Sequence, residues 1–194
     1  VNSVHELYGG RGFSSNYSLY NSLKYVIENK IEGDLVECGV FKGRSTAVMM
    51  ETLIKNNSFS KNIYLYDTFE GMTKGSEIDY QINKSNNSYY KSINQKKTMT
   101  EGYNSYPIEM VKKNLEKFNY PSEKTIFVKG SVLKTLKNNL PNKISLLHLD
   151  TDFYDSSLYE IEQLYDLVVT GGVIIYDDYG SWMGQHKATN DFFN

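Results

Sequence analysis

Residues 35–46, LVECGVFKGRST, decide the fold, because an apolar run with strand character passes through a glycine turn directly into a helical pattern. Gly39 and Gly43 let the backbone approach a ligand closely, and the first N–H groups of the helix, from Ser45 onward, face that ligand. The G-x-x-x-G spacing differs from the G-x-G-x-x-G of nicotinamide-binding enzymes. Glu37, just before the turn, disfavours a pyrophosphate and favours an ammonium group, such as the one on S-adenosylmethionine. A simple tight turn is the alternative interpretation of this loop taken alone.

Short apolar, β-branched runs alternate with helical patterns along the rest of the chain. This alternation is typical of a parallel sheet covered by helices on both faces. The predicted strands are 35–40, 63–67, 125–129, 144–149 and 173–176. The predicted helices are 17–29, 45–55, 108–118, 156–167 and, at the end, 185–193. The sequence therefore predicts a Rossmann-like α/β fold with a mostly parallel central sheet.

Length and composition indicate a single domain over 1–194, because 194 residues with 40% hydrophobic residues provide one substantial core. A net charge of −2, with 23% charged residues mixed along the chain, argues against nucleic acid and anionic membranes as partners. The single cysteine, Cys38, lies in an apolar run, which favours a buried thiol and a reducing compartment. No apolar run approaches the ~20 residues that span a bilayer, so we expect a soluble, cytoplasmic protein.

One stretch, 69–106, interrupts the alternation, because it is polar and lacks helical or strand periodicity. Loops of this length in compact domains are functional lids or solvated insertions, and the sequence leaves both interpretations open. Only one predicted helix follows the fifth strand. We therefore expect either that the C-terminal strands of this architecture are missing from the chain or that its sheet is smaller than usual.

Polar residues follow the predicted strands at one edge of the expected sheet. Asp67 ends the second strand, where an acidic residue commonly accepts two ribose hydroxyl groups. Gly39 ends the neighbouring strand, and Gly130 and Ser131 follow the third, where they are placed to line an adenine. Taken alone, Asp67 fits a turn cap equally well. In the ligand-binding role, its removal is expected to weaken cofactor binding and to leave folding nearly unchanged.

The sharpest signal is a convergence of carboxylates. Asp150 closes the fourth strand, and Asp177 and Asp178 close the fifth. Parallel neighbours place these ends at one edge, where three carboxylates repel one another unless a cation lies among them. Oxygen ligands from loops suit Mg²⁺, Mn²⁺ or Ca²⁺ rather than zinc. The alternative is that Asp177 and Asp178 cap the last helix.

The neighbouring polar residues have simpler interpretations. Asp152 and Asp155 are expected to cap the helix that follows them. His148 lies inside a predicted buried strand and is expected to be a hydrogen-bonded core histidine. His186, near the start of the last helix, is placed to lean over the site. None of the histidines has zinc spacing with Cys38.

Five segments resemble the macrocin O-methyltransferase family in their order and spacing. They are VECGVFKGRS, YLYDTFEGM, FVKGSV, LLHLDTDFYDSSLYEIEQLY and GGVIIYDDYGSW. The resemblance covers most of the chain from about Leu35 onward. It implies the class I methyltransferase fold, S-adenosylmethionine as cofactor, Mg²⁺ as metal, and methylation of a sugar hydroxyl on a glycosylated natural product or related glycan.

The resemblance also assigns residues by position. The cofactor motif is matched by Glu37, Gly39, Gly43, Ser45 and Asp67. The metal site is matched by Asp150, Asp177 and Asp178. The chain departs from the family at His148, where the family often has a basic residue, and at His186, where arginine is common.

The implied reaction is an in-line displacement in which an acceptor oxygen attacks the sulfonium methyl group. A Mg²⁺ or Mn²⁺ ion among the carboxylates lowers the pKa of the acceptor hydroxyl, and Asp150, His186 or a water takes its proton. The expected partner is a small-molecule glycoside or sugar nucleotide, and a homo-oligomer is left open. A catechol- or phenol-type O-methyltransferase is one alternative. A non-catalytic methyltransferase-like binding module is another, and the intact set of carboxylates argues against it.

Overall fold

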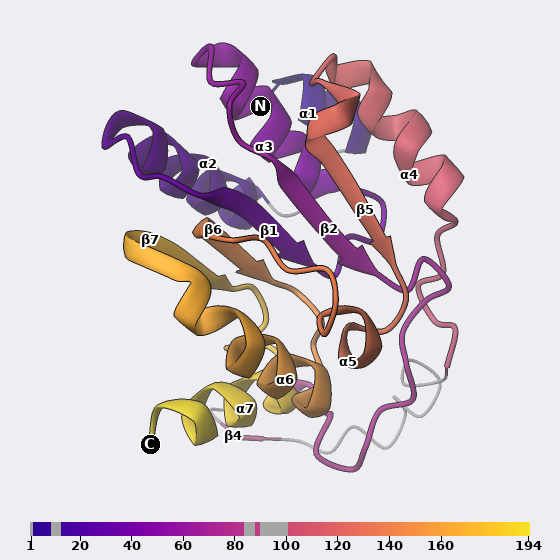
Figure 1. The fold of residues 1–194 in the computed structure, drawn as a ribbon. Helices are drawn as coiled ribbons and strands as arrows, with labels where there is room; N and C mark the ends of the chain where they lie inside the picture. Colours follow the sequence, from indigo (N-terminus) through magenta and orange to yellow (C-terminus); the bar gives the residue numbers. More distant parts are fainter. Residues whose placement is uncertain (1, 9–12, 84–87, 90–100) are drawn as a thin grey trace.

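The computed structural model describes residues 2–8, 13–83, 88–89 and 101–194. The main strands are β1 (Asp34–Cys38), β2 (Ile63–Asp67), β5 (Thr125–Lys129), β6 (Ile144–Leu149) and β7 (Val168–Tyr176). They form one sheet in the order β5-β2-β1-β6-β7, and all of its strand pairs are parallel. Figure 1 shows this sheet at the centre of the molecule with helices on both sides. The predicted Rossmann-like α/β fold is confirmed.

The central strands lie inside the molecule because they are apolar on both faces. Every residue of β6 is buried, and so are the last four residues of β1. Leu35 of β1 is in register with Ile63 on one side and with Leu146 on the other. Successive side chains of a strand point to opposite faces. Leu35 and Val36 accordingly belong to two different hydrophobic cores.

Each face of the sheet carries its own layer of helices. One face is covered by α1 (Asn2–Tyr8), α2 (Phe13–Glu28), α3 (Arg44–Lys55) and α4 (Ile108–Leu115). The other is covered by α5 (Val132–Thr135), α6 (Tyr154–Leu164) and α7 (Met183–Phe193). Leu23 and Met49 lie in the first core, and Leu147 and Ile161 lie in the second.

The predicted elements occur with boundaries shifted by a few residues. The strand predicted over 35–40 ends at Cys38, because Gly39 already has a left-handed backbone with φ of 87°. The two helices predicted to end at 118 and 167 finish in 3-10 turns, which tighten a last helical turn. These turns, and a third one before β5, are Glu116–Phe118, Tyr165–Leu167 and Ser122–Lys124.

β7 is longer than its sequence suggests. The predicted strand 173–176 omits the first part of β7, which begins at Val168. Two consecutive glycines usually indicate the end of a strand. Here β7 continues through Gly171 and Gly172 as an irregular strand. Gly171 has φ of 83°, and the register against β6 shifts just before Leu146. Such bulges accommodate glycine within a strand.

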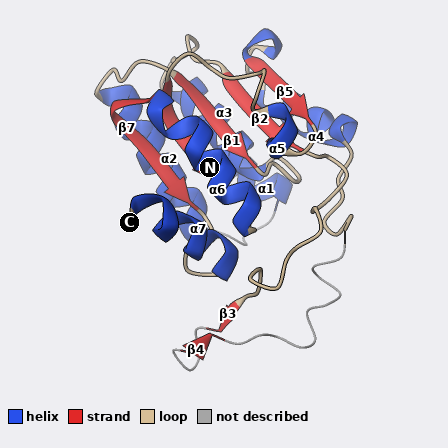
Figure 2. Ribbon diagram, turned by 60° about the horizontal axis from the view of Figure 1, so that its bottom comes forward, coloured by secondary structure: helices blue, strands red, loops and turns tan. Residues whose placement is uncertain are grey.

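The polar excursion 69–106 contains regular structure where it is described. A short antiparallel pair, β3 (Ile82–Asn83) and β4 (Ser88–Tyr89), stands away from the central sheet (Figure 2). This pair, α1 and α5 have no counterpart in the prediction, because each is too short to show a periodic pattern. Residues 84–87 and 90–100 of the excursion lie outside the described residues.

Backbone hydrogen bonds fasten both ends of the segment 72–83, which we call the strap. At its start, the N–H of Met72 donates to the carbonyl of Tyr103 at 2.7 Å. At its end, the N–H of Ile82 donates to the carbonyl of Ser181 at 2.8 Å, just before α7. The strap therefore runs from the carboxyl end of β2 to the beginning of α7.

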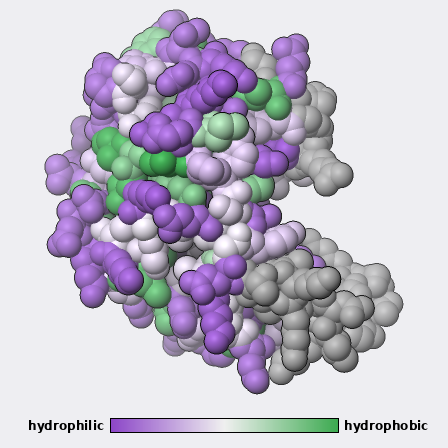
Figure 3. All heavy atoms as spheres, turned by 90° about the vertical axis from the view of Figure 1, so that its right-hand side faces the viewer, coloured by the Kyte–Doolittle hydropathy of each residue, from purple (hydrophilic) through white to green (hydrophobic). Residues whose placement is uncertain are grey.

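The surface over β5 and α4 is mainly hydrophilic, with small hydrophobic areas (Figure 3). This agrees with the mixed charge of the sequence. Within the described part of the chain, no helix combines the length and the apolar character that a membrane crossing requires.

Candidate active site

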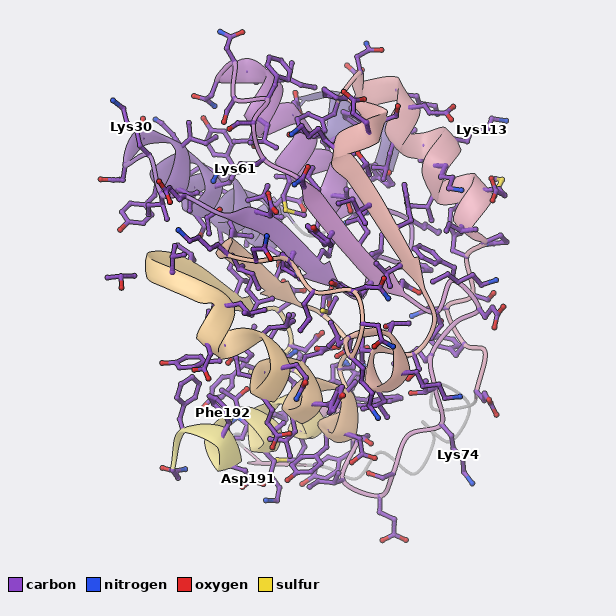
Figure 4. All side chains as sticks on the ribbon, in the orientation of Figure 1. Lys30, Lys61, Lys74, Lys113, Asp191 and Phe192 are labelled. Atoms are coloured by element: carbon purple, nitrogen blue, oxygen red, sulfur yellow. The ribbon has the colours of Figure 1, made fainter. Side chains whose placement is uncertain are left out.

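The carboxyl ends of the strands surround a cavity of about 310 Å³. Open α/β sheets bind ligands at this edge, and small-molecule sites begin at roughly this volume. The predicted site residues that line the cavity are Gly39, Asp67, Gly130, Ser131 and Asp150. The strap contributes Met72, Thr73, Lys74 and Asp79 to its wall. Figure 4 shows Lys74 on the strap, well away from Asp191 and Phe192 of α7.

A second cavity, of about 450 Å³, lies around Lys61 at the opposite, amino end of the sheet (Figure 4). The Lys61 ammonium is buried and donates to the carbonyls of Ile31 and Gly33, both at 2.7 Å, and to the Ser145 hydroxyl at 3.0 Å. An ammonium has three donors. All three are used within the protein, so we assign Lys61 a structural role.

Gly39 lets the ends of β1 and β6 meet. A Cβ atom at this position would lie 2.0 Å from the carbonyl oxygen of Asp150, so no other residue fits. The N–H of Gly39 donates to the carbonyl of Tyr66 at 2.9 Å, and the N–H of Asp150 donates to that of Cys38 at 2.8 Å. The glycine loop is therefore held directly against Asp150.

Asp67 organises the glycine loop through its carboxylate. Its Oδ2 accepts the N–H groups of Val40 at 2.7 Å and Phe41 at 2.8 Å, and its Oδ1 accepts that of Phe69 at 2.6 Å. Phe41 and Phe69 have φ of 48° and 54°, which is uncommon for aromatic residues. A carboxylate offers about four acceptor positions. The three backbone donors thus leave room for a hydroxyl group of a ligand.

Glu37 lies beneath the glycine loop and is 1% exposed. Its carboxylate accepts a hydrogen bond from the Thr46 hydroxyl and lies 3.3 Å from Nδ1 of His148. It is not among the described residues that line the cavity. In this position it fixes the first turn of α3 from below, and direct contact with a cofactor stays a prediction.

Gly43 and Ser45 lie at the start of α3, also outside the cavity lining. Gly43 has φ of 83°, and a Cβ there would come within 3.2 Å of the side chains of Val111 and Leu115. The glycine therefore allows α4 to pack against the beginning of α3. Both residues shape the loop, and their contact with a cofactor stays a prediction.

Gly130 and Ser131 form a wall of the cavity after β5. The Gly130 N–H donates to the carbonyl of Asp67 at 2.9 Å, which joins this turn to the end of β2. A Cβ at Gly130, whose φ is 136°, would lie 2.9 Å from the Thr135 side chain. Leu133 lines the same wall although it is 40% exposed. An exposed leucine provides an apolar surface suited to a purine.

The structure brings Asp150, Asp177 and Asp178 together, with one carboxylate oxygen of each within 4.8 Å of the others. Burial, followed by the neighbouring Asp178 and Asp177 carboxylates, raises the pKa of Asp150 well above its usual range. The capping alternative lacks support, because the cap residue of α7 is Trp182 and its side chain makes no cap hydrogen bond. A crowded set of carboxylates with oxygen donors only fits Mg²⁺ or Mn²⁺.

His148 lies between two acidic residues and is 2% exposed. Its Nδ1 is 3.3 Å from Glu37 Oε1, and its Nε2 is 3.8 Å from Asp177 Oδ1. Burial lowers the pKa of His148, but the neighbouring Asp177 and Glu37 carboxylates outweigh burial and raise that pKa to about 9. The neighbouring His148, with help from the Ser15 hydroxyl, lowers the pKa of Asp177. His148 is a core histidine with partners, as expected.

Asp152 lies in the cavity wall, and its predicted capping role is wrong. The cap residue of α6 is Phe153, and no side chain caps the helix from that position. Burial and the Asp178 carboxylate raise the pKa of Asp152 well above its usual range. Strand alternation does not reveal this position, because Asp152 follows the end of β6 and has a left-handed backbone with φ of 62°.

Asp79 of the strap takes the place of the predicted caps of α6. Its Oδ1 accepts the N–H of Tyr154 at 2.7 Å, and its Oδ2 accepts the N–H and the hydroxyl of Ser76 at 2.7 and 2.9 Å. The capping role predicted for Asp155 is therefore wrong as well. Asp79 and Tyr154 are separated by 75 positions, so no local pattern reveals the pair.

His186 lies beside Tyr179 on the outer part of α7. Its Nδ1 is 3.1 Å from the carbonyl of Tyr179, and the two rings stack with their centroids 4.5 Å apart. His186 is not among the described residues that line the cavity. Its predicted catalytic role therefore gains no support from this geometry.

The model of the macrocin-O-methyltransferase (TylF) family matches residues 12–194. Over 163 residues the chain is 26% identical to the 8-demethyl-8-(2,3-dimethoxy-alpha-L-rhamnosyl)-tetracenomycin-C 4'-O-methyltransferase of Streptomyces olivaceus, covering 82% of the chain and 59% of that protein. Over 154 residues it is 27% identical to the demethyldecarbamoylnovobiocin O-methyltransferase of Streptomyces niveus, covering 79% and 55%. The chain thus spans less than two thirds of the length of these curated relatives.

Solved structures show the same architecture. The O-methyltransferase NovP matches with a TM-score of 0.78 at 22% identity, covering 93% of this chain and 71% of NovP. The calicheamicin methyltransferase CalS11 matches with a TM-score of 0.70 at 16% identity, covering 92% and 70%. At such identities these likenesses concern the fold. Since the family model covers the sheet, the glycine loop and the acidic strand ends together, the chain belongs to the macrocin O-methyltransferase family.

Proposed function

We propose that the protein is an S-adenosylmethionine-dependent, Mg²⁺-assisted O-methyltransferase that methylates a sugar hydroxyl of a small-molecule glycoside or sugar nucleotide. One observation carries this proposal. In a member of this family, a single cavity joins the glycine loop at Gly39 and the Asp67 carboxylate to Asp150, which meets Asp177 and Asp178. The names of the relatives mention a rhamnosyl-bearing tetracenomycin and TDP-rhamnose, which supports a sugar acceptor.

The cofactor occupies the part of the cavity between β1, β2 and β5 in this proposal. Asp67 accepts one ribose hydroxyl at the acceptor position that its backbone donors leave open. Gly130, Ser131 and Leu133 face the adenine. Gly39 lets the backbone approach the methionine end of the cofactor. Glu37, Gly43 and Ser45 maintain the conformation of the glycine loop.

The metal lies among Asp150, Asp177 and Asp178 in this proposal, and Mn²⁺ is an alternative ion. The chemistry that a bound dication supplies is charge compensation and a lowered pKa of an adjacent hydroxyl group. His148 keeps Asp177 in its ionised form by lowering its pKa. The strap excludes water from the side of the cavity that faces the carboxylates, where it contributes Asp79.

The proton of the acceptor hydroxyl needs a base within the cavity. Both oxygens of Asp79 already accept hydrogen bonds from Ser76 and Tyr154. Asp150 belongs to the three-carboxylate group. Asp152 lines the cavity outside that group and is therefore the proposed proton acceptor, with Asp150 and His186 as the residues to compare.

Three acceptors test this function: TDP-rhamnose, 4-nitrophenyl rhamnoside and catechol, each incubated with the protein, S-adenosylmethionine and Mg²⁺. Methylation of either sugar compound, detected by mass spectrometry, supports the proposal. Methylation of catechol alone would show that the acceptor is a phenol and not a sugar. Binding of S-adenosylhomocysteine without methylation of any acceptor would favour a non-catalytic module.

Asp152→Asn is expected to lower the rate of methyl transfer about 100-fold or more, the usual contribution of a general base.

A further inference from the structure

Gln185, near the start of α7, is completely buried although its side chain is polar. Its amide contacts two strand ends. Nε2 donates to the carbonyl of Leu149 at 3.1 Å, and Oε1 accepts the N–H of Asp178 at 2.7 Å. Leu149 is the last residue of β6 and directly precedes Asp150. The amide therefore bridges the two strand ends that carry the proposed metal-binding carboxylates.

The backbone of Gln185 adds a third contact with the acidic segments. Its N–H donates to the carbonyl of Asp152 at 2.9 Å. The close approach depends on Gly184, where a Cβ would lie 2.9 Å from the same carbonyl and 2.7 Å from the Tyr154 nitrogen. The beginning of α7 is thus pressed against the loop after β6.

An amide is the group that this position requires. Leu149 presents an acceptor and Asp178 presents a donor, so the bridging side chain must supply both a donor and an acceptor. A carboxylate lacks the donor when ionised and would add negative charge beside three carboxylates that already repel one another. Glutamine satisfies both strand ends and remains neutral.

We propose that Gln185 is a positioning residue that fixes the separation of Asp150 and Asp178 and thereby sets the affinity of the site for a dication. This inference rests on the proposed function, because it presupposes a metal among these carboxylates. Residues that orient metal ligands without touching the metal typically change affinity by about 10- to 100-fold when they are replaced.

Calorimetric titration of Mn²⁺ into the wild type, Gln185→Met and Thr189→Val tests the inference. Methionine keeps the volume of glutamine and removes both amide bonds. Thr189 is a matched control: it lies on the same helix, it is 9% exposed, and its hydroxyl donates to the Gln185 carbonyl at 2.8 Å without reaching a strand end. We expect Gln185→Met to bind Mn²⁺ at least about 10-fold more weakly and Thr189→Val to bind it like the wild type. Urea denaturation measures the stability of both variants in parallel.

Equal affinity in the wild type and Gln185→Met would overturn the inference, and so would equal losses in the two variants. Both results leave the proposed metal site standing, because the wild type binds Mn²⁺ in each. A wild type that does not bind Mn²⁺ would overturn the metal site and the inference together. If Gln185→Met does not fold, Gln185→Asn replaces it. Asparagine keeps an amide but is one methylene too short to reach Leu149 and Asp178 at once, so it carries the same expectation.

Discussion

At the scale of single residues, Asp67 serves the fold and the site with one carboxylate. The backbone N–H groups of Val40, Phe41 and Phe69 donate to it, and both phenylalanines have a left-handed backbone. The sequence suggests a residue whose removal spares folding, because backbone donors leave no trace in a sequence pattern. These bonds indicate the opposite, since the loss of one half-buried acceptor leaves several backbone donors without that partner.

Asp67→Ala is expected to lower the free energy of unfolding by about 1–3 kcal/mol, the cost of leaving such donors unsatisfied. It is also expected to weaken binding of S-adenosylhomocysteine. Urea denaturation and calorimetric titration measure the two effects separately. Asp166→Ala is the control, because Asp166 is exposed and its replacement should change stability by no more than about 0.5 kcal/mol. Unchanged affinity for S-adenosylhomocysteine would remove Asp67 from the cofactor site.

Glu160 of α6 is buried, and no described residue places an opposite charge beside it. One of its oxygens accepts the Thr151 hydroxyl at 3.0 Å, and Oε1 has no hydrogen-bond partner among the described residues. Burial raises the pKa of Glu160 to about 8, although the Thr151 bond lowers it in part. The folded protein therefore keeps a proton that the unfolded chain releases above its ordinary pKa of 4.5. Between these two pKa values, stability falls as the pH rises.

Glu160→Gln is expected to be more stable than the wild type at pH 8 and nearly equal to it at pH 5. Glutamine is close in shape to the protonated acid and cannot ionise. Each pH unit inside the window contributes up to about 1.4 kcal/mol to the difference. Urea denaturation at a series of pH values measures it, and a difference that stays constant across that range would rule out a buried, protonated Glu160.

At the scale of elements, the strap is an anchored wall of the cavity. Backbone bonds hold it at Met72 and Ile82, and Asp79 binds the first N–H of α6. The alternative of a solvated insertion therefore does not describe 72–83. A lid function for the whole of 69–106 stays a prediction, because part of that range lies outside the described residues.

Asp79→Ala is expected to loosen the strap and the first turn of α6 together, because it removes the bond between them. Hydrogen exchange should accelerate in both segments and stay unchanged in β1, at the centre of the sheet. Ser76→Ala is the matched control, since it removes only the hydroxyl bond at 2.9 Å and keeps the bond to Tyr154. Equal exchange in Asp79→Ala and the wild type would show that the strap is held by its backbone bonds alone.

Which elements could be predicted depends on the length of their apolar pattern. The predicted strands 63–67, 125–129 and 144–149 coincide with β2, β5 and β6. Continuous apolar runs mark strands that are covered on both faces, as β6 is throughout, whereas the edge strand β5 is only partly buried. The beginning of β7 could not be predicted, because its two glycines suggest the end of a strand. In the structure β7 continues through them and pairs with β6 on both sides of them. α5 could not be predicted, because four residues are too few to show a period.

At the scale of the whole molecule, parallel strands explain how much of the site the sequence reveals. Asp150, Asp177 and Asp178 follow neighbouring strands, so their meeting at one edge follows from the topology. The partners of Asp79 and Gln185 could not be predicted, because those contacts join residues 75 and 36 positions apart and depend on how the strap and α7 pack.

The most direct measurement of the proposed site is thermal unfolding of the protein saturated with S-adenosylhomocysteine, with and without Mg²⁺. At Mg²⁺ about a hundred times its Kd, the midpoint of the wild type should rise by roughly 5 °C or more, and chelator should reverse the rise. Asp177→Asn should lose most of the Mg²⁺ effect and keep the stabilisation by S-adenosylhomocysteine. A wild type that does not respond to Mg²⁺, or an equal response in Asp177→Asn, would contradict a dication among Asp150, Asp177 and Asp178.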